Sequence, residues 1–254
     1  MSNTNSSSHH PRVAQPAPNS TPEPVRRDSS FYSDHVVFQH TAKVEACLFK
    51  VPRHKFEQGS EVFRNMFAMP PTRGVAEGQS DDLPLVLESI LADEFRSLLR
   101  VMFWPLYGSS VEEMLAPPLE LDEWTHVLKL TTLWGFDRLR QASIDALRQL
   151  LEREDPVRWV ALARKYEVRE WLLPSLHALA RREKALQVHE AEQLGISTAM
   201  KMAEVRESFS GRSRHNRSDV SRASHNYEPE ILRFFGEEIN PIGEKRIGSE
   251  RHWE

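Results

Sequence analysis

Cysteine is almost absent from this sequence, because Cys47 is the only one among 254 residues. A single cysteine excludes an internal disulfide framework and a zinc site built from several cysteines. Since Cys47 stands in an apolar strand pattern, we expect a buried structural thiol. Long apolar runs are also missing, as none approaches the roughly 18 residues that cross a membrane. The polar N-terminus has no hydrophobic signal core, so we expect a soluble intracellular protein, cytoplasmic or nuclear, without membrane contact.

Neither charge sign is in large excess, since 33 Lys and Arg against 37 Asp and Glu leave a formal net charge of −4. This balance gives no drive toward nucleic acid, and we expect no nucleic-acid partner. The ten glycines form no phosphate-binding loop and no G-x-S-x-G elbow. His9 and His10 are adjacent in a polar tail, and the other histidines lack zinc-site spacing. We therefore expect no enzyme, no cofactor and no metal site.

Both ends of the chain are poor in large apolar residues. Residues 1–30 are rich in Pro and Ser, and residues 210–226 carry four Arg against one Asp. Such segments bury too little surface to offset chain entropy, so we expect disorder over 1–30 and 210–254. Arg26-Arg27-Asp28-Ser29 has the spacing that basophilic kinases recognise, which makes Ser29 a candidate phosphorylation site. Chance occurrence of this short pattern is the alternative.

The most informative stretch is 45–67, EACLFKVPRHKFEQGSEVFRNMF. It predicts a strand over 47–51, a break at Pro52 and two short helices, the second capped by Ser60. A strand at 36–38 is expected to pair with 47–51 as a hairpin, and 83–87 predicts a third strand. An apolar face at i, i+3, i+4 and i+7 from Phe95 predicts a helix that ends at Pro105.

Helical patterns dominate the rest of the sequence. Segments 121–134 and 136–151, separated by Gly135, predict a helical hairpin. Asp155-Pro156 is a helix-start signal, and further helices are expected over 171–185 and over 188–209 with a bend near Gly195. Four tryptophans stand at core spacings of these helices, which favours packing over base stacking: Trp124, Trp134, Trp159 and Trp171.

The order of these elements resembles the BTB/POZ interaction fold of the type abundant in mushroom-forming fungi. The family's opening pattern, F-K-x-H-[RK]-x-x-L followed by a serine and an aromatic helix, is filled by Phe49, Lys50, Arg53, Phe56, Ser60, Phe63 and Phe67. Pro52 stands at the family's usual histidine position. The closing helix pair is matched at Leu130, Leu133, Trp134, Phe136, Leu139 and Leu147. Residues 153–209 resemble a short form of the BACK helical extension that follows many BTB domains.

The resemblance implies an α+β fold, with a small sheet and a helical bundle over 31–152 and a helical extension over 153–209. It implies protein partners, as an adaptor or a self-associating scaffold, including a possible homodimer. Two narrower roles stay open: a substrate adaptor of a cullin-type ubiquitin ligase, and a nuclear transcription-associated scaffold. In cullin-binding relatives a hydrophobic-x-Glu motif follows the third helix, and Val111 and Glu113 fit it. Met114 and Leu115 would add apolar area, and ordinary loop residues are the alternative.

Overall fold

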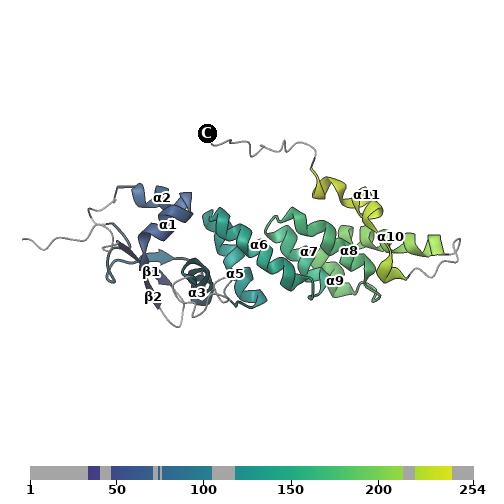
Figure 1. Cartoon of the computed structure of the whole chain (residues 1–254), viewed down its shortest axis with the longest axis horizontal. Coiled ribbons are helices and arrows are strands. Elements are labelled where there is room, and N and C mark those ends of the chain that lie inside the picture. Colours follow the sequence, from purple (N-terminus) through teal and green to yellow (C-terminus); the bar gives the residue numbers. More distant parts are fainter. Residues whose placement is uncertain are drawn as a thin grey trace, which may run out of the picture. The chain divides into compact units, whose positions relative to one another are not determined.

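The protein has an α+β fold, with ten α-helices and one three-stranded sheet in the part of the chain that the structure describes (Figure 1). This computed structural model describes residues 34–40, 47–70, 74, 76–104, 118–213 and 221–241. Residues from Asp34 onward belong to one compact unit. The predicted α+β class is confirmed at this level.

The sheet has β1 (His35–His40) at its centre. Strand β2 (Cys47–Pro52) pairs with β1 antiparallel, and β3 (Leu85–Leu87) pairs with it parallel, which gives the order β2-β1-β3. Phe38 is opposite Phe49 on one side and Leu85 on the other. The predicted hairpin and third strand are therefore confirmed. Cys47 is only partly buried, so the expectation of a buried thiol is wrong, because β2 is an edge strand.

An aromatic core joins the sheet to the first helices, α1 (Arg53–Gly59), α2 (Glu61–Ala68) and α3 (Ala92–Met102). The Phe38 ring lies 5.0 Å from that of Phe56 and 5.2 Å from that of Phe95, between ring centroids. These three side chains are fully buried. Edge-to-face contacts of this kind add to the energy of burying the rings.

The predicted helical hairpin is present as α5 (Leu121–Trp134) and α6 (Asp137–Leu151), which lie side by side in Figure 1. Gly135 ends α5 in the left-handed region, with φ 66° and ψ 42°. A residue with a β-carbon is disfavoured there, so glycine suits this tight reversal. The turn brings Phe136 into the core, where it is fully buried.

The C-terminal part is a stack of short helices: α7 (Pro156–Lys165), η1 (Arg169–Trp171), α8 (Leu172–Arg181), α9 (Val188–Leu194), α10 (Ile196–Ser213), η2 (Arg222–Ser224) and α11 (Glu228–Ile239). Asp155 caps α7 through the Val157 N–H, as predicted. The expected helix over 171–185 is shorter, since α8 ends at Arg181. The expected bend at Gly195 is a break between α9 and α10.

The hydrophobic core runs without a gap across residue 152. Trp159, Tyr166 and Trp171 belong to the same buried cluster as the sheet residues. A second cluster joins α7, α8 and α10 to α11, through residues such as Val160 and Val205. The extension therefore shares its core with the α5–α6 pair. Three of the four tryptophans predicted to pack in the core are buried, and Trp134 is partly buried against it.

The prediction of a disordered segment over 210–254 is wrong for its described part. Helix α10 continues to Ser213, and residues 221–241 contain η2 and α11. The physical reason is an apolar stripe at helical spacing, because Tyr227, Ile231 and Phe235 are all buried in the second cluster. The predicted disorder of residues 1–30 falls outside the described residues. None of the described helices is both long and apolar enough to cross a bilayer.

Candidate interaction surface

Ser60 fixes the α1–α2 hairpin to the end of α5. Its hydroxyl accepts a hydrogen bond from the Phe63 N–H at 3.2 Å, which caps α2 as predicted. The same hydroxyl donates to the Trp134 carbonyl, which the sequence does not reveal. Ser60 is buried, so both bonds lie out of water and are costly to break. The hairpin is thereby held at a defined position beside the Gly135 turn.

Arg53 holds α1 and α2 together from the solvent side. Its guanidinium lies 4.5 Å from the centroid of the Phe67 ring and donates to the Phe67 carbonyl at 3.1 Å. It also pairs with Glu57, at 2.8 Å. Stacking and directional bonding from one guanidinium are typical of arginine at surfaces that must stay rigid. The two short helices thus form one preorganised unit.

A groove lies between this unit and the start of α6. Its volume is about 820 Å³, and its wall comprises Lys55, Gln58, Gly59, Glu61, Val62, Arg64, Met102, Gly135, Phe136, Asp137, Arg138 and Leu139. The close approach of α1 to α6 requires Gly59, because a β-carbon there would lie 2.8 Å from Cδ1 of Phe136. The groove is large enough to receive several side chains of another protein.

The groove combines an apolar strip with charges of both signs. Val62 is 49% exposed on α2. A β-carbon on Gly135 would lie 3.8 Å from Cγ2 of Val62, so this valine borders the α5–α6 turn. The exposed rim carries three cations and two anions, Lys55, Arg64, Arg138, Glu61 and Asp137. An exposed apolar centre with a polar rim is the usual make-up of a protein-binding patch.

A second surface is formed by α3 and α5, which run antiparallel. Arg100 pairs with Glu123 at one end, and Lys129 pairs with Glu94 at 2.6 Å toward the other. Burial opposes ionisation of Glu94, but hydrogen bonds from Lys129 and the Leu91 N–H prevail and lower the pKa of its carboxyl. Leu91 and Leu133, near the Glu94–Lys129 end, are 60% and 58% exposed. This face is therefore rigid, with unburied apolar side chains.

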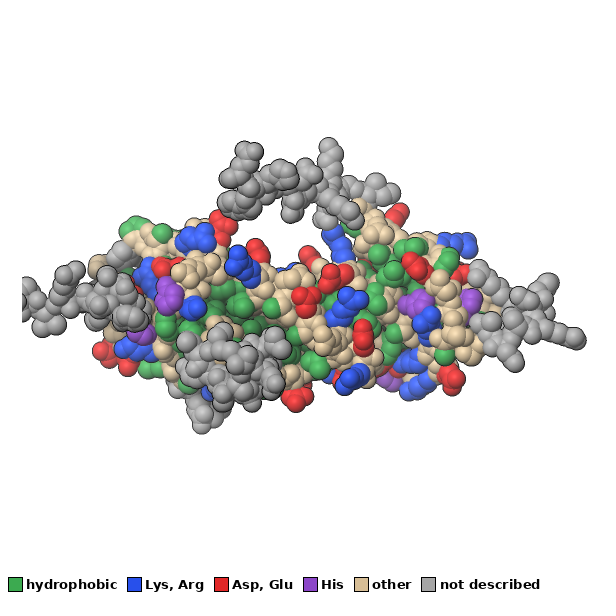
Figure 2. All heavy atoms as spheres, in the orientation of Figure 1, with side chains coloured by type: hydrophobic (Ala, Val, Ile, Leu, Met, Phe, Trp, Pro, Cys, Tyr) green, Lys and Arg blue, Asp and Glu red, His purple; other side chains and the backbone are tan. Residues whose placement is uncertain are grey.

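The site residues predicted from the sequence cannot be placed on either surface. Val111, Glu113, Met114 and Leu115 lie outside the described residues, and so does Ser29. In the chain, the described elements on either side of that loop are α3 and α5. Figure 2 shows positive and negative side chains interspersed on the visible face, without a large field of one sign.

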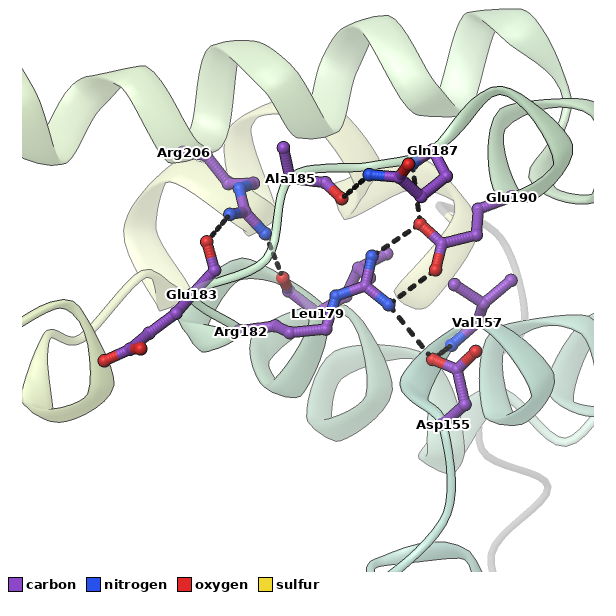
Figure 3. A network of polar contacts seen from close by, with 9 residues as sticks. All are labelled: Asp155, Val157, Leu179, Arg182, Glu183, Ala185, Gln187, Glu190 and Arg206. Carbon is purple, nitrogen blue, oxygen red and sulfur yellow. Dashed lines mark hydrogen bonds and ion pairs between the residues drawn. The ribbon is translucent and has the colours of Figure 1, made fainter.

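The extension contains a partly buried ionic network that the sequence did not reveal (Figure 3). Arg182 pairs with Glu190 at 2.6 Å and with Asp155 at 3.2 Å, which ties α7, α8 and α9 together. The hydrogen bond from Arg182 outweighs burial and lowers the pKa of the Glu190 carboxyl to about 2. Glu190 also accepts the Gln187 N–H at the start of α9. Only this local capping contact has a sequence signal, the Gln-x-x-Glu spacing.

Among the described residues, no group of three or more His, Cys, Asp or Glu side chains is arranged to hold a metal ion. The pKa of the Glu190 carboxyl is strongly lowered, and its pairing with Arg182 is that of a structural ion pair. What these two surfaces offer chemically is apolar area and hydrogen-bonding groups for another chain.

Comparison with protein-family models found no match, and comparisons with curated proteins and with solved structures found no similar chain. The resemblance to BTB/POZ domains therefore depends on the sequence patterns quoted above.

Proposed function

We propose that this protein is a BTB-type interaction module, an adaptor or scaffold that self-associates through the groove beside α2. The observation that carries the proposal is this groove itself, with Val62 exposed at its edge and the α1–α2 hairpin held rigid by Ser60 and Arg53. A preorganised surface loses little freedom on binding, so more of its contact energy is retained as affinity.

The arrangement of charge supports a second copy of the chain as the partner. In a two-fold symmetric interface the same patch meets itself, so it must carry groups that complement each other. The groove rim provides Arg138 and Lys55 as cations, with Asp137 and Glu61 as anions, from both of its walls. The order of the elements also supports the BTB-type assignment, since it begins with a strand hairpin and closes with a helical pair.

A second candidate function is that of a substrate adaptor for a cullin-type ubiquitin ligase. The α3–α5 face favours it, because two ion pairs hold the helices rigidly while Leu91 and Leu133 stay exposed. Such unburied leucines are suited to anchor a partner. A nuclear transcription-associated scaffold would use the same self-association through the groove.

Sedimentation of the purified full chain tests self-association directly. We expect a monomer–dimer equilibrium that shifts with concentration, as mass action requires. Binding of a purified cullin N-terminal fragment, measured by titration calorimetry, tests the second candidate. A chain that stays monomeric and binds no cullin fragment would contradict both.

A further inference from the structure

At its start, helix α11 contacts α8 through His177, beside the bond from Arg181 of α8 to the His225 carbonyl. The Tyr227 N–H donates to Nε2 of His177, on α8, at 3.2 Å. Asn226 Oδ1 lies 3.2 Å from the same nitrogen and also accepts the Glu228 N–H at 3.0 Å. A single ring nitrogen thus faces both a donor and an acceptor at the start of α11.

Nε2 can serve only one of these two neighbours. In a neutral ring with a lone pair on Nε2, it accepts from the Tyr227 N–H. In the charged ring Nε2 carries a proton, which can be donated only to Asn226, and the Tyr227 N–H loses its acceptor. Tyr227 is fully buried, so its N–H has little access to water as a replacement. Protonation therefore exchanges a hydrogen bond to the backbone of the buried Tyr227 for one to the exposed side chain of Asn226.

The surrounding groups favour the neutral ring. Burial is the largest effect, and with the positive charge of Arg181 on α8 and that of His225 it lowers the pKa of His177. The hydrogen bond to Asn226 and the charge of Glu228, at the start of α11, act in the opposite direction. Nearby, Arg206 of α10 binds the Leu179 carbonyl, and Arg222 of η2 stacks on Phe209. These two add further positive charge to this end of α8.

The contact between His177 and Tyr227 keeps a large apolar surface buried. The ring of Tyr227 lies 6.3 Å from that of His177 and 4.6 Å from that of His225, between centroids. Ile231 and Phe235 follow on the same helix face, and both are buried in the second core cluster. If α11 leaves α8, these three side chains and their counterparts become exposed to water.

We propose that His177 is a proton-sensitive latch, whose protonation frees the Tyr227 N–H and releases α11 from α8. The latch is independent of the groove beside α2. It would expose the apolar face of α11, and the surface that this face covers, only in acid. The sign follows from the ring chemistry. Docking is fully favoured above the ordinary imidazole value of 6.5 and weakens as the pH falls from there toward the lowered pKa.

Hydrogen exchange of the full chain, corrected for the intrinsic effect of pH, tests the latch. In the wild-type protein we expect protection of α11 to fall by about tenfold per pH unit between the ordinary and the lowered pKa. His177→Gln keeps an acceptor for the Tyr227 N–H but does not titrate, so its α11 protection should be independent of pH in that range. His189→Gln, at an exposed histidine of α9, is the matched control and should behave as wild type.

Two results would overturn the latch. One is a pH-dependent loss of α11 protection in His177→Gln equal to that of the wild type, and the other is the absence of this loss in His189→Gln. If His177→Gln leaves α11 unprotected at every pH, the ring of His177 is titrated by NMR in the wild-type protein. A midpoint at the pH where the loss of α11 protection levels off supports the latch, because that pH is the pKa of the docked ring, and a midpoint elsewhere overturns the proposal.

Discussion

At the scale of the single residue, the Ser60 hydroxyl makes one hydrogen bond that caps α2 and another to Trp134, 74 positions along the chain. We predict that Ser60→Ala lowers the free energy of unfolding by about 1–2 kcal/mol, since it removes a helix cap and leaves a carbonyl of α5 without its donor. Urea unfolding measures the change. Ser197→Ala, at an exposed serine in the first turn of α10, is the control and should stay near wild type. An equal effect of both substitutions would refute the role given to Ser60.

A second prediction at the residue scale concerns Glu190 and the pH dependence of the protein's stability. Its carboxyl has a pKa of about 2 in the folded protein against an ordinary 4.5. A depressed carboxyl pKa stabilises the fold above the ordinary value, and this contribution is lost as the pH falls from 4.5 toward 2. The loss amounts to at most about 3 kcal/mol. Thermal unfolding across this range should show it.

Glu190→Gln is the informative comparison for that pH profile. It should flatten the profile between those two values, although it also destabilises the protein by removing one of the two carboxylates that pair with Arg182. An unchanged acid profile in this variant would assign the pH dependence to other carboxyls.

Contacts at this scale were predictable from the sequence only where they are local. Ser60 as the cap of α2 and Asp155 as the cap of α7 follow from residue type and position. The bond from Ser60 to Trp134 and the pairing of Arg182 with Glu190 depend on how helices pack. No spacing rule encodes such tertiary pairs, so these parts of the candidate surfaces were found only in the structure.

At the scale of the element, α11 shows what composition alone conceals. A short apolar stripe in a polar segment appeared too small to order, yet it completes a core that α7, α8 and α10 leave open. By contrast, α5 and α6 were predicted well because each has enough length for its own periodicity to show. The strands were predicted from their alternation and from the break at Pro52.

We predict that Phe235→Ala destabilises the docked α11, since truncating a buried phenylalanine costs about 3–5 kcal/mol. Limited proteolysis at neutral pH should then cut within 221–241 much faster than in the wild-type protein. Glu237→Ala, at an exposed position of the same helix, should leave the cleavage rate unchanged. Equal cleavage of wild type and Phe235→Ala would show that α11 is not held by this side chain.

At the scale of the whole molecule, the core is continuous while the exposed apolar side chains are scattered. Trp159 and Trp171 share a cluster with the sheet, so the extension supports the α5–α6 pair that borders the groove. The sequence predicted the order of elements up to about residue 209, but it predicted neither α11 nor the groove. The groove arises where Gly59 lets α1 approach Phe136, a contact between residues far apart in the chain.

The most direct test of the proposed function is sedimentation of a matched pair of variants beside the wild-type chain. Val62→Glu places a charge at the edge of the groove, and Val188→Glu places the same charge at another exposed valine, on α9. Both positions are on the surface, so all three proteins should unfold alike. We predict that the wild type and Val188→Glu dimerise and that Val62→Glu stays monomeric. A Val62→Glu chain that dimerises as tightly as the wild type would contradict the account.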